Sequence, residues 1–390
     1  MEMQKIILFA NTDWYLFNFR RSLALALQGN GYDVLLVSPP GEYGPRLRSL
    51  GLRWRPLWMD RRSVNPLRES ALLLRIARLL RQERPALLHN FTIKCAVYGS
   101  LAARMARVPA RINAVDGLGY VFASSDRKAR LLRPVVRKLL RSALHGQSAH
   151  LILQNPDDRA AFERFELIEA GRLALIPGAG VDCTRYVPRV ARSIAADPRP
   201  SVLLAARLLW EKGIAEYAQA ARILRGQGRN VRFLLAGTPD PGNPAAVPEA
   251  TLHEWVKEGL VEWLGHVADM RQLYASVDIV TLPSYYREGV PTSLTEAAAC
   301  GLPLITTDMP GCREVVTDGE DGLLIPPRDA EALASAIARL LDSPELAKRL
   351  GDAARAKALA LFDERIVIQR TLEVYRALLA RPRGLHVAPA

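Results

Sequence analysis

The sequence is poor in cysteine and contains no long apolar run. Its 390 residues include four cysteines, Cys95, Cys183, Cys300 and Cys312, and none of them forms a CxxC pair. A disulfide framework is therefore not expected, and reduced thiols in a cytoplasmic protein are the plain interpretation. No segment approaches the roughly 18–20 consecutive apolar residues of a transmembrane helix. Residues 1–5 lead straight into a strand-like segment and lack the apolar core of a signal peptide.

Acidic residues are scarce in one part of the chain. Residues 41–150 contain 22 lysines and arginines against 6 aspartates and glutamates, whereas residues 151–390 contain 28 basic and 31 acidic residues. The whole chain has a net charge of +13. A basic first half beside a near-neutral second half indicates an anionic partner for the first half, either nucleic acid or anionic lipid.

The first half alternates short apolar segments with helical patterns. Helices are expected at 66–84, 92–107 and 127–144, and Asn155 followed by Pro156 is typical of a helix start. Six segments bounded by Gly, Pro or Asn are predicted strands: 5–10, 33–38, 86–89, 110–115, 150–154 and 172–177. This alternation predicts a parallel sheet covered by helices on both faces.

The same pattern restarts after a segment rich in proline. Residues 187–200 hold three prolines and no periodicity, so we interpret 189–200 as a linker after a first domain of residues 1–188. Six further strands are predicted: 201–206, 231–236, 261–264, 278–282, 302–307 and 322–326. The second domain is expected at 201–362, followed by a helix at 363–380 and a frayed tail at 381–390. A length of 390 residues suits two such domains.

Two glutamates flank a predicted helix start in the second domain. Glu288 and Gly289 lie in a loop after a strand, and a helix with proline in its first turn carries Glu296. Free N–H groups at a helix start suit a diphosphate, and a carboxylate one turn inside can accept hydrogen bonds from a ribose. Taken alone, the two residues would be ordinary surface glutamates. The strand–loop–helix context favours a binding site.

Other polar residues and turns also follow predicted strands. Arg207 and Lys212 lie in the turn after the first strand of the second domain, where they could neutralise a diphosphate, although helix-start charges are often simply solvated. Gly237 ends another strand, and His266 and Val267 follow a third; such turns can hold a nucleobase. Because carboxyl ends of parallel strands meet at one edge, these residues are expected to lie together.

These residues form a recognisable set. Together they resemble the motifs of glycosyltransferase family four. The residues that carry this resemblance are Arg207…Lys212-Gly213, Pro283-Ser284…Glu288-Gly289-Val290-Pro291…Glu296, Gly301-Leu302-Pro303 and Gly311-Cys312-Arg313-Glu314. That resemblance implies an α/β protein of GT-B fold, with two doubly wound Rossmann-like domains facing across a cleft. Segments 89–94 and 117–122 are similar to bacterial N-acetylgalactosaminyltransferases that extend undecaprenyl-diphosphate-linked sugars.

The resemblance also implies roles for individual residues. Arg207 and Lys212 would bind the diphosphate of a UDP-sugar, Glu296 its ribose and Glu288 the transferred sugar. The loop residues Gly289, Val290, Pro291 and Thr292 would contact sugar hydroxyls and phosphate. The family retains the anomeric configuration and needs no cofactor or protein-bound metal. Consistently, the sequence has no Asp-x-Asp motif and no cluster of His and Cys.

The first domain is expected to bind the acceptor. Many relatives carry a Gly-Gly turn after the first strand, whereas this chain has Asn11-Thr12-Asp13-Trp14, so Asp13 is expected on the acceptor side. His89 and Lys94 are expected to contact substrate because they belong to the subgroup-like segment. Asp116 follows a strand at a position where some relatives place a histidine near the sugar, and it is a candidate catalytic residue.

The segment 127–141 interleaves basic and apolar residues. On a helix it presents a basic face and an apolar face, which fits either a core-packed helix with a solvated side or a helix docked on anionic lipid. No nucleic-acid-binding module is recognisable, so no nucleic-acid partner is expected.

We therefore expect a glycosyltransferase at the inner face of the cytoplasmic membrane, moving an N-acetylhexosamine from UDP to a polyprenyl-diphosphate-linked glycan. The alternatives are a UDP-sugar epimerase of the same fold and a non-catalytic protein that binds nucleotide-sugar or anionic lipid.

Overall fold

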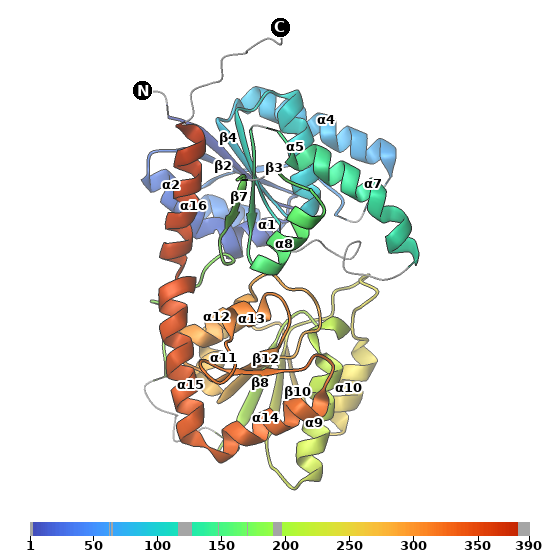
Figure 1. Cartoon of the computed structure of the whole chain (residues 1–390), viewed down its shortest axis with the longest axis vertical. Helices are drawn as coiled ribbons and strands as arrows, with labels where there is room; N and C mark the ends of the chain where they lie inside the picture. Colours follow the sequence, from blue (N-terminus) through green and yellow to red (C-terminus); the bar gives the residue numbers. More distant parts are fainter. Residues whose placement is uncertain are drawn as a thin grey trace. The chain divides into compact units, whose positions relative to one another are not determined.

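The structure is a computed structural model with two compact units, which are described separately (Figure 1). It describes residues 3–61, 63, 65–115, 127–146, 148–169, 171–189 and 197–380. One unit comprises Met1–Ala179 with Val367–Ala390, and the other comprises Gly180–Ile366. The sequence placed the division later, at 188. The earlier division arises because the backbone N–H of Val181 donates to the carbonyl of Phe362, 2.8 Å away, which fastens this segment to the second unit.

The first unit is built on a parallel sheet with strand order β3-β2-β1-β4-β5-β6-β7. The strands are β1 Lys5–Phe9, β2 Asp33–Ser38, β3 Arg53–Pro56, β4 Leu87–Phe91, β5 Ala110–Ala114, β6 Ala149–Leu153 and β7 Leu173–Leu175. β4 and β5 are buried along their whole length, as expected for strands with helices on both faces.

Helices cover both faces of this sheet. Helices α2, α3 and α16 pack on one face, where Leu27, Leu47 and Tyr375 meet the strands in one apolar cluster. Helices α4 and α5 pack on the other face, and α7 and α8 continue that layer over β6. The helices are α1 Asp13–Tyr15, η1 Leu16–Arg20, α2 Arg21–Gly29, α3 Tyr43–Ser49, α4 Pro66–Glu83, α5 Ile93–Met105, α7 Arg127–Leu144, α8 Pro156–Arg164 and α16 Glu364–Leu379.

The second unit repeats this architecture with strand order β10-β9-β8-β11-β12-β13, again parallel. Its strands are β8 Ser201–Ala205, β9 Arg232–Ala236, β10 Glu262–Gly265, β11 Ile279–Leu282, β12 Leu304–Thr307 and β13 Leu323–Ile325. Helices α9, α10 and α14 pack on one face, and α11 and α12 pack on the other.

The remaining elements of the second unit are helical. They are η2 Trp210–Lys212, α9 Ile214–Gly226, α10 Glu249–Lys257, α11 Met270–Ser276, α12 Thr292–Ala299, α13 Cys312–Val315, α14 Ala330–Asp342, α15 Pro344–Lys357 and η3 Ala358–Phe362.

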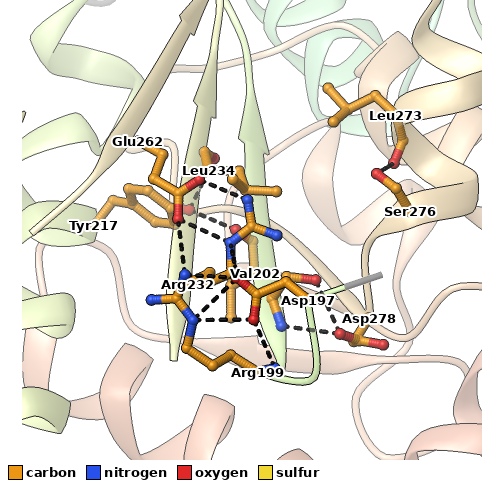
Figure 2. Close-up of polar contacts among 11 residues, drawn as sticks. Asp197, Arg199, Val202, Tyr217, Arg232, Leu234, Glu262, Leu273, Ser276 and Asp278 are labelled. Atoms are coloured by element: carbon orange, nitrogen blue, oxygen red, sulfur yellow. Dashed lines mark hydrogen bonds and ion pairs between the residues drawn. The ribbon is translucent and has the colours of Figure 1, made fainter. Parts of the chain in front are cut away.

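Charged side chains pair with one another at the amino ends of the second sheet's strands (Figure 2). Arg232 donates two hydrogen bonds to Glu262, at 2.8 and 2.6 Å, and this bonding lowers the pKa of the Glu262 carboxyl. Asp278 accepts from the backbone N–H of Ser201 at 2.9 Å. The charges at this edge have partners within the protein, so the opposite edge is the one to search for a ligand site.

All twelve strands predicted from the sequence form, and Asn155 caps α8 as predicted. Strand β3 was not among the predictions, because its four residues, Arg53–Pro56, bury only one side chain and show no apolar run. No helix in the described part of the chain is long and apolar enough to span a membrane. The candidate residue Asp116 lies outside the described residues.

Candidate functional site

The turns at the carboxyl ends of β8, β9 and β10 are joined by hydrogen bonds and by close backbone approach. The N–H of Gly237 donates to the carbonyl of Gly265 at 2.7 Å, and the indole of Trp263 donates to the carbonyl of Gly237 at 2.9 Å. Gly237 has φ +137°, and a Cβ there would lie 1.9 Å from the carbonyl oxygen of Ala206. Glycine is thus required at this strand end, and the three predicted turns share one edge of the sheet.

Lys212 and Glu288 form an ion pair at this same edge. Lys212 ends the short helix η2 after β8, whereas Glu288 lies in the loop between β11 and α12. Their charged groups are in direct hydrogen-bond contact, and the side chains are only 12% and 11% exposed. The ammonium also lies 5.8 Å from the ring centre of Tyr286. Two residues that were predicted separately from the sequence therefore form one largely buried pair of opposite charges.

Ser284 holds the carboxylate of this pair in place. Its hydroxyl lies 2.7 Å from Glu288 Oε1 and 3.1 Å from the carbonyl of Glu211, so it is positioned between the two loops. The N–H of Tyr285 donates to the carbonyl of Glu211 at 3.0 Å, which joins the loops a second time. Burial, with a further contribution from Glu288, raises the pKa of the Glu211 carboxyl. The loop geometry is therefore fixed by backbone contacts as well as by charge.

Gly311 lies directly behind the Glu288–Gly289 loop. It has φ +82°, and a Cβ at this position would lie 1.7 Å from the carbonyl oxygen of Gly289. The N–H of Glu288 donates to the carbonyl of Pro310 at 3.2 Å, so the two loops are in backbone contact. Any side chain at 311 would displace the loop that carries Glu288.

Gly311→Ala is therefore expected to destabilise the protein by about 2–4 kcal/mol and to lower activity more than tenfold, because both backbone strain and overlap act there. Gly319→Ala is the matched control: Gly319 has φ +72°, and a Cβ there would meet no atom within 4 Å, so only strain of about 1 kcal/mol acts. Thermal denaturation and turnover of both variants test this. Equal behaviour of the two variants would contradict the proposed support of the loop.

Glu296 lies within α12 and is held by two tyrosines. The hydroxyl of Tyr186 donates to Glu296 Oε1 at 2.9 Å, and the hydroxyl of Tyr274 lies 3.1 Å from Oε2. Burial raises the pKa of the Glu296 carboxyl to about 7, although the two hydrogen bonds act in the opposite direction. This carboxyl group is thus oriented from both sides, and its charge changes near neutral pH.

The other residues predicted to bind the sugar donor differ in exposure. Arg207 is 63% exposed on its side chain and pairs with Asp240 at 3.2 Å. His266 is exposed, whereas Val267 packs partly against the apolar cluster beneath α12. The loop from Gly289 to Thr292 leads into the first turn of α12, with Pro291 as its N-cap residue.

The predicted acceptor residues of the first unit have partners within the protein. Asp13 accepts from the backbone N–H groups of Tyr43 and Gly44 at 2.8 and 2.9 Å, which fixes the start of α3. His89 is buried, contacts the hydroxyl of Tyr375, and has its pKa lowered well below the usual value by burial. These contacts engage both carboxylate oxygens of Asp13 and only Nδ1 of His89, whose Nε2 is buried without a hydrogen-bond partner among the described residues. The expected contacts of both residues with substrate stay predictions.

Lys94 also has a structural set of partners. Its ammonium donates to the carbonyls of Asp60 and Ser63 at 2.7 and 3.0 Å and pairs with Glu69 at 2.9 Å. The side chain therefore fastens the segment before α4 to the start of α5. Its expected contact with substrate stays a prediction.

Thr92, between β4 and α5, has an unusual backbone. Its φ is +74° and its ψ is 155°, a conformation that a β-branched residue rarely adopts. Such strain persists where the surroundings impose it, and it concentrates at functional sites. From the sequence, this residue stood out only as part of a motif, because no residue pattern reveals a strained turn.

Three residues of the second unit's site were missed as functional candidates: Ser284, Tyr186 and Tyr274. Ser284 stood inside the recognised motif, so its position four residues before Glu288 was a usable signal. Tyr186 is 110 residues from Glu296, and no local pattern could have joined them. In the described part of the chain, no three His, Cys, Asp or Glu side chains lie together as a metal site requires.

Comparisons with known proteins match both units. Residues 5–154 match the family model described as glycosyl transferase 4-like, and residues 199–343 match that of glycosyl transferases group 1. The chain is 30% identical over 369 residues to N,N'-diacetylbacillosaminyl-diphospho-undecaprenol alpha-1,3-N-acetylgalactosaminyltransferase of Campylobacter jejuni, covering 92% of this chain and 95% of that protein.

Two further matches cover most of the chain. UDP-Gal:alpha-D-GlcNAc-diphosphoundecaprenol alpha-1,3-galactosyltransferase of Escherichia coli is 26% identical, with 73% of this chain and 74% of that protein covered. The solved structure of sucrose-phosphate synthase from Thermosynechococcus elongatus is 24% identical and superposes with a TM-score of 0.79, covering 97% of this chain and all of that one. The predicted architecture of two parallel-sheet domains is thus confirmed.

Proposed function

Because this chain belongs to glycosyltransferase family four, whose members have the GT-B fold, we propose that it moves a sugar from UDP to a polyprenyl-diphosphate-linked glycan with retention of configuration. It is an enzyme of the glycosyltransferase class. The relatives described above are transferases, which favours transfer over epimerisation.

The observation that carries the proposal is the buried pair of Lys212 and Glu288 beside the start of α12. In the structure, each charge of this pair neutralises the other. A donor diphosphate would take over the ammonium of Lys212, with Arg207 as a second cation, and would release the carboxylate of Glu288 to accept hydrogen bonds from sugar hydroxyls. Lys212 would thus contact the diphosphate of the UDP-sugar and Glu288 would contact its sugar, in place of the contact between the two side chains.

The chemistry would follow from this arrangement. The bond between the anomeric carbon and the β-phosphate oxygen breaks, the electron pair leaves with UDP, and the acceptor hydroxyl attacks from the same face. The proton of that hydroxyl goes to the departing phosphate. Lys212 and Arg207 would stabilise the growing phosphate charge, while Glu296 would hold the ribose. No cofactor or protein-bound metal enters this scheme, and a catalytic role for Asp116 is retained as part of the proposal.

The acceptor and the location follow from the relatives. The Campylobacter and Escherichia enzymes are named for undecaprenol-linked diphosphate acceptors, and the first of them transfers N-acetylgalactosamine. We therefore favour an N-acetylhexosamine donor, a role in assembly of bacterial surface polysaccharide or glycan, and action at the cytoplasmic face of the membrane. The basic helix α7, with Arg133 and Lys138, is the contact with anionic lipid proposed from sequence.

The test is a donor screen in which UDP release and the mass of the lipid-linked product are measured together. The purified chain is mixed with a panel of UDP-sugars and a polyprenyl-diphosphate-linked acceptor. One donor should give acceptor-dependent UDP release and a product heavier by one sugar, with the anomeric configuration of the donor. UDP release without an acceptor would favour an epimerase, and UDP binding without turnover would favour a non-catalytic binding protein.

A further inference from the structure

An exposed surface that combines apolar and basic side chains lies on α4 and on the segment before it. Helix α4 buries one apolar side, Leu72, Ile76, Leu79 and Leu80, against the sheet. It also carries apolar side chains on the opposite side: Leu67 is 82% exposed and Leu74 is 59% exposed. Their spacing of seven residues places them on one face, with the exposed Ala71 between them.

Trp58 extends this apolar surface from outside the helix. Its side chain is 55% exposed, and the guanidinium of Arg75 lies 5.9 Å from the centre of its ring. The Lys94 ammonium binds the carbonyls of Asp60 and Ser63 and the carboxylate of Glu69, which connects these two residues of the preceding segment to α4. The tryptophan is therefore presented beside the helix by a braced segment, since it lies two residues before the first of these partners.

Basic side chains surround these apolar ones. Arginines 61, 68, 75, 78 and 81 are all exposed. The two acidic residues of α4 do not offset them, because Glu69 is buried against Lys94 and Glu83 pairs with Lys5 at 2.7 Å. The bonding of Glu83 with Lys5 lowers the pKa of its carboxyl, so Glu83 stays ionised and engaged. The exposed face of α4 is thus cationic with an apolar centre.

We propose that this surface, Trp58 with the exposed residues of α4, docks on an anionic lipid bilayer. Leucines standing in water beside arginines match an interface in which apolar side chains enter the headgroup region and cations meet lipid phosphates. A nucleic acid would use the charges and the tryptophan, but it offers nothing to the two leucines. The proposal rests on the proposed function, because a polyprenyl-linked acceptor resides in a membrane.

Helix α7 is the weaker candidate on the described contacts. Arg137 and Arg141 both pair with Glu166, at 3.5 and 3.1 Å, and Arg137 also donates to the carbonyl of Phe165. Part of the positive charge of α7 is therefore neutralised within the protein. On α4, by contrast, the acidic residues pair with lysines and arginines away from its exposed side.

Flotation of the full chain with vesicles tests the proposal. The vesicles are phosphatidylglycerol mixed with phosphatidylethanolamine, and pure phosphatidylcholine vesicles serve as the uncharged comparison. Arg68→Glu with Arg75→Glu should lower binding to the anionic vesicles at least about tenfold. Leu67→Ser with Leu74→Ser should lower it by a similar factor and should abolish the binding that survives 0.5 M salt, roughly the condition that screens the charges.

Two control variants make the result specific. Arg370→Glu with Arg376→Glu reverses two exposed charges on α16, on the other face of the sheet, and should leave flotation within about twofold of the wild type. Arg133→Glu with Lys138→Glu tests α7. Loss of flotation in the α7 variant together with normal flotation of both α4 variants would overturn the proposal. Binding to single-stranded RNA without binding to vesicles would overturn it as well.

The same variants separate this proposal from the proposed function. Sugar transfer to a water-soluble, short-chain diphosphate acceptor needs no membrane, so the α4 variants should retain wild-type UDP release in that assay. If the wild type floats but shows no turnover, the proposed function fails and the docking surface stands. If it turns over but does not float, the docking surface fails alone.

Discussion

Glu288→Gln is expected to lower kcat by about 10²–10³-fold, because the variant loses the charge proposed to hold the transferred sugar in its reactive position. It is also expected to destabilise the protein by about 3 kcal/mol, since the ammonium of Lys212 would be left without its counter-charge at a buried position. The change is nearly isosteric and preserves an acceptor for the hydroxyl of Ser284. Turnover at saturating donor and chemical denaturation measure the two effects separately.

A double variant distinguishes the proposed catalytic role from a structural one. Lys212→Met combined with Glu288→Gln removes both charges, so most of the lost stability should return while kcat stays at least as low as in Glu288→Gln. A variant of Glu288 alone that kept wild-type kcat would contradict the sugar-binding role. Ser284→Ala is a milder companion: it keeps both charges, loses one hydrogen bond, and should lower kcat less than Glu288→Gln does.

Glu296→Gln is expected to weaken donor binding and yet to stabilise the protein at alkaline pH. The carboxyl has a folded-state pKa of about 7, above its ordinary value of 4.5. Between these values the folded state holds a proton that the unfolded state has lost, so the stability of the wild type falls as the pH rises from 4.5 to 7. Above that range the buried charge costs up to about 3 kcal/mol, which the uncharged glutamine avoids.

The size of the expected stabilisation therefore depends on pH. At pH 8 the glutamine variant should be the more stable protein, and near pH 4 the difference should vanish, because the carboxyl is then protonated in both states. Its KM for the UDP-sugar should rise about tenfold or more at pH 8, since a ribose diol donates more strongly to a carboxylate than to an amide. A KM that is unchanged at this pH would contradict the ribose role of Glu296.

Tyr186→Phe and Tyr274→Phe test the support of this carboxyl. Each change removes one hydrogen bond to Glu296 without removing the ring, and those bonds lower its pKa. Both variants should therefore move the pH at which donor affinity develops to a higher value. A uniform loss of stability with an unchanged pH profile of KM would indicate that the tyrosines only pack.

Features that depend on residues close together in the chain could be predicted from the sequence. Twelve strands could be located from apolar segments bounded by turns, and Glu288 could be placed in a loop because Leu282 ends a strand and Pro291 begins a helix. Arg207 and Lys212 were found for the same reason, as charges in a strand-to-helix turn. β3 escaped because three of its four residues are exposed, so it lacks an apolar segment.

Partnerships between distant residues could not be predicted from the sequence. The pairing of Lys212 with Glu288 crosses 76 residues, and the contact of His89 with Tyr375 crosses 286. His89 and Asp13 were predicted to contact substrate, and their contacts within the protein could not be seen in the sequence. The exposure of Leu67 and Leu74 on α4 could not be predicted either, because leucines occur on both the buried and the exposed side of this helix.

The four cysteines, first noted for their scarcity, make the chain convenient for labelling. All four are buried and free, and burial raises the pKa of Cys183 to about 11 and those of Cys95, Cys300 and Cys312 to about 12. Thiol reagents attack the exposed thiolate, so the native protein should remain unmodified. A cysteine introduced at Ala71 would then be the one reactive position among these, and a polarity-sensitive fluorophore attached there would report directly on the depth at which α4 meets lipid.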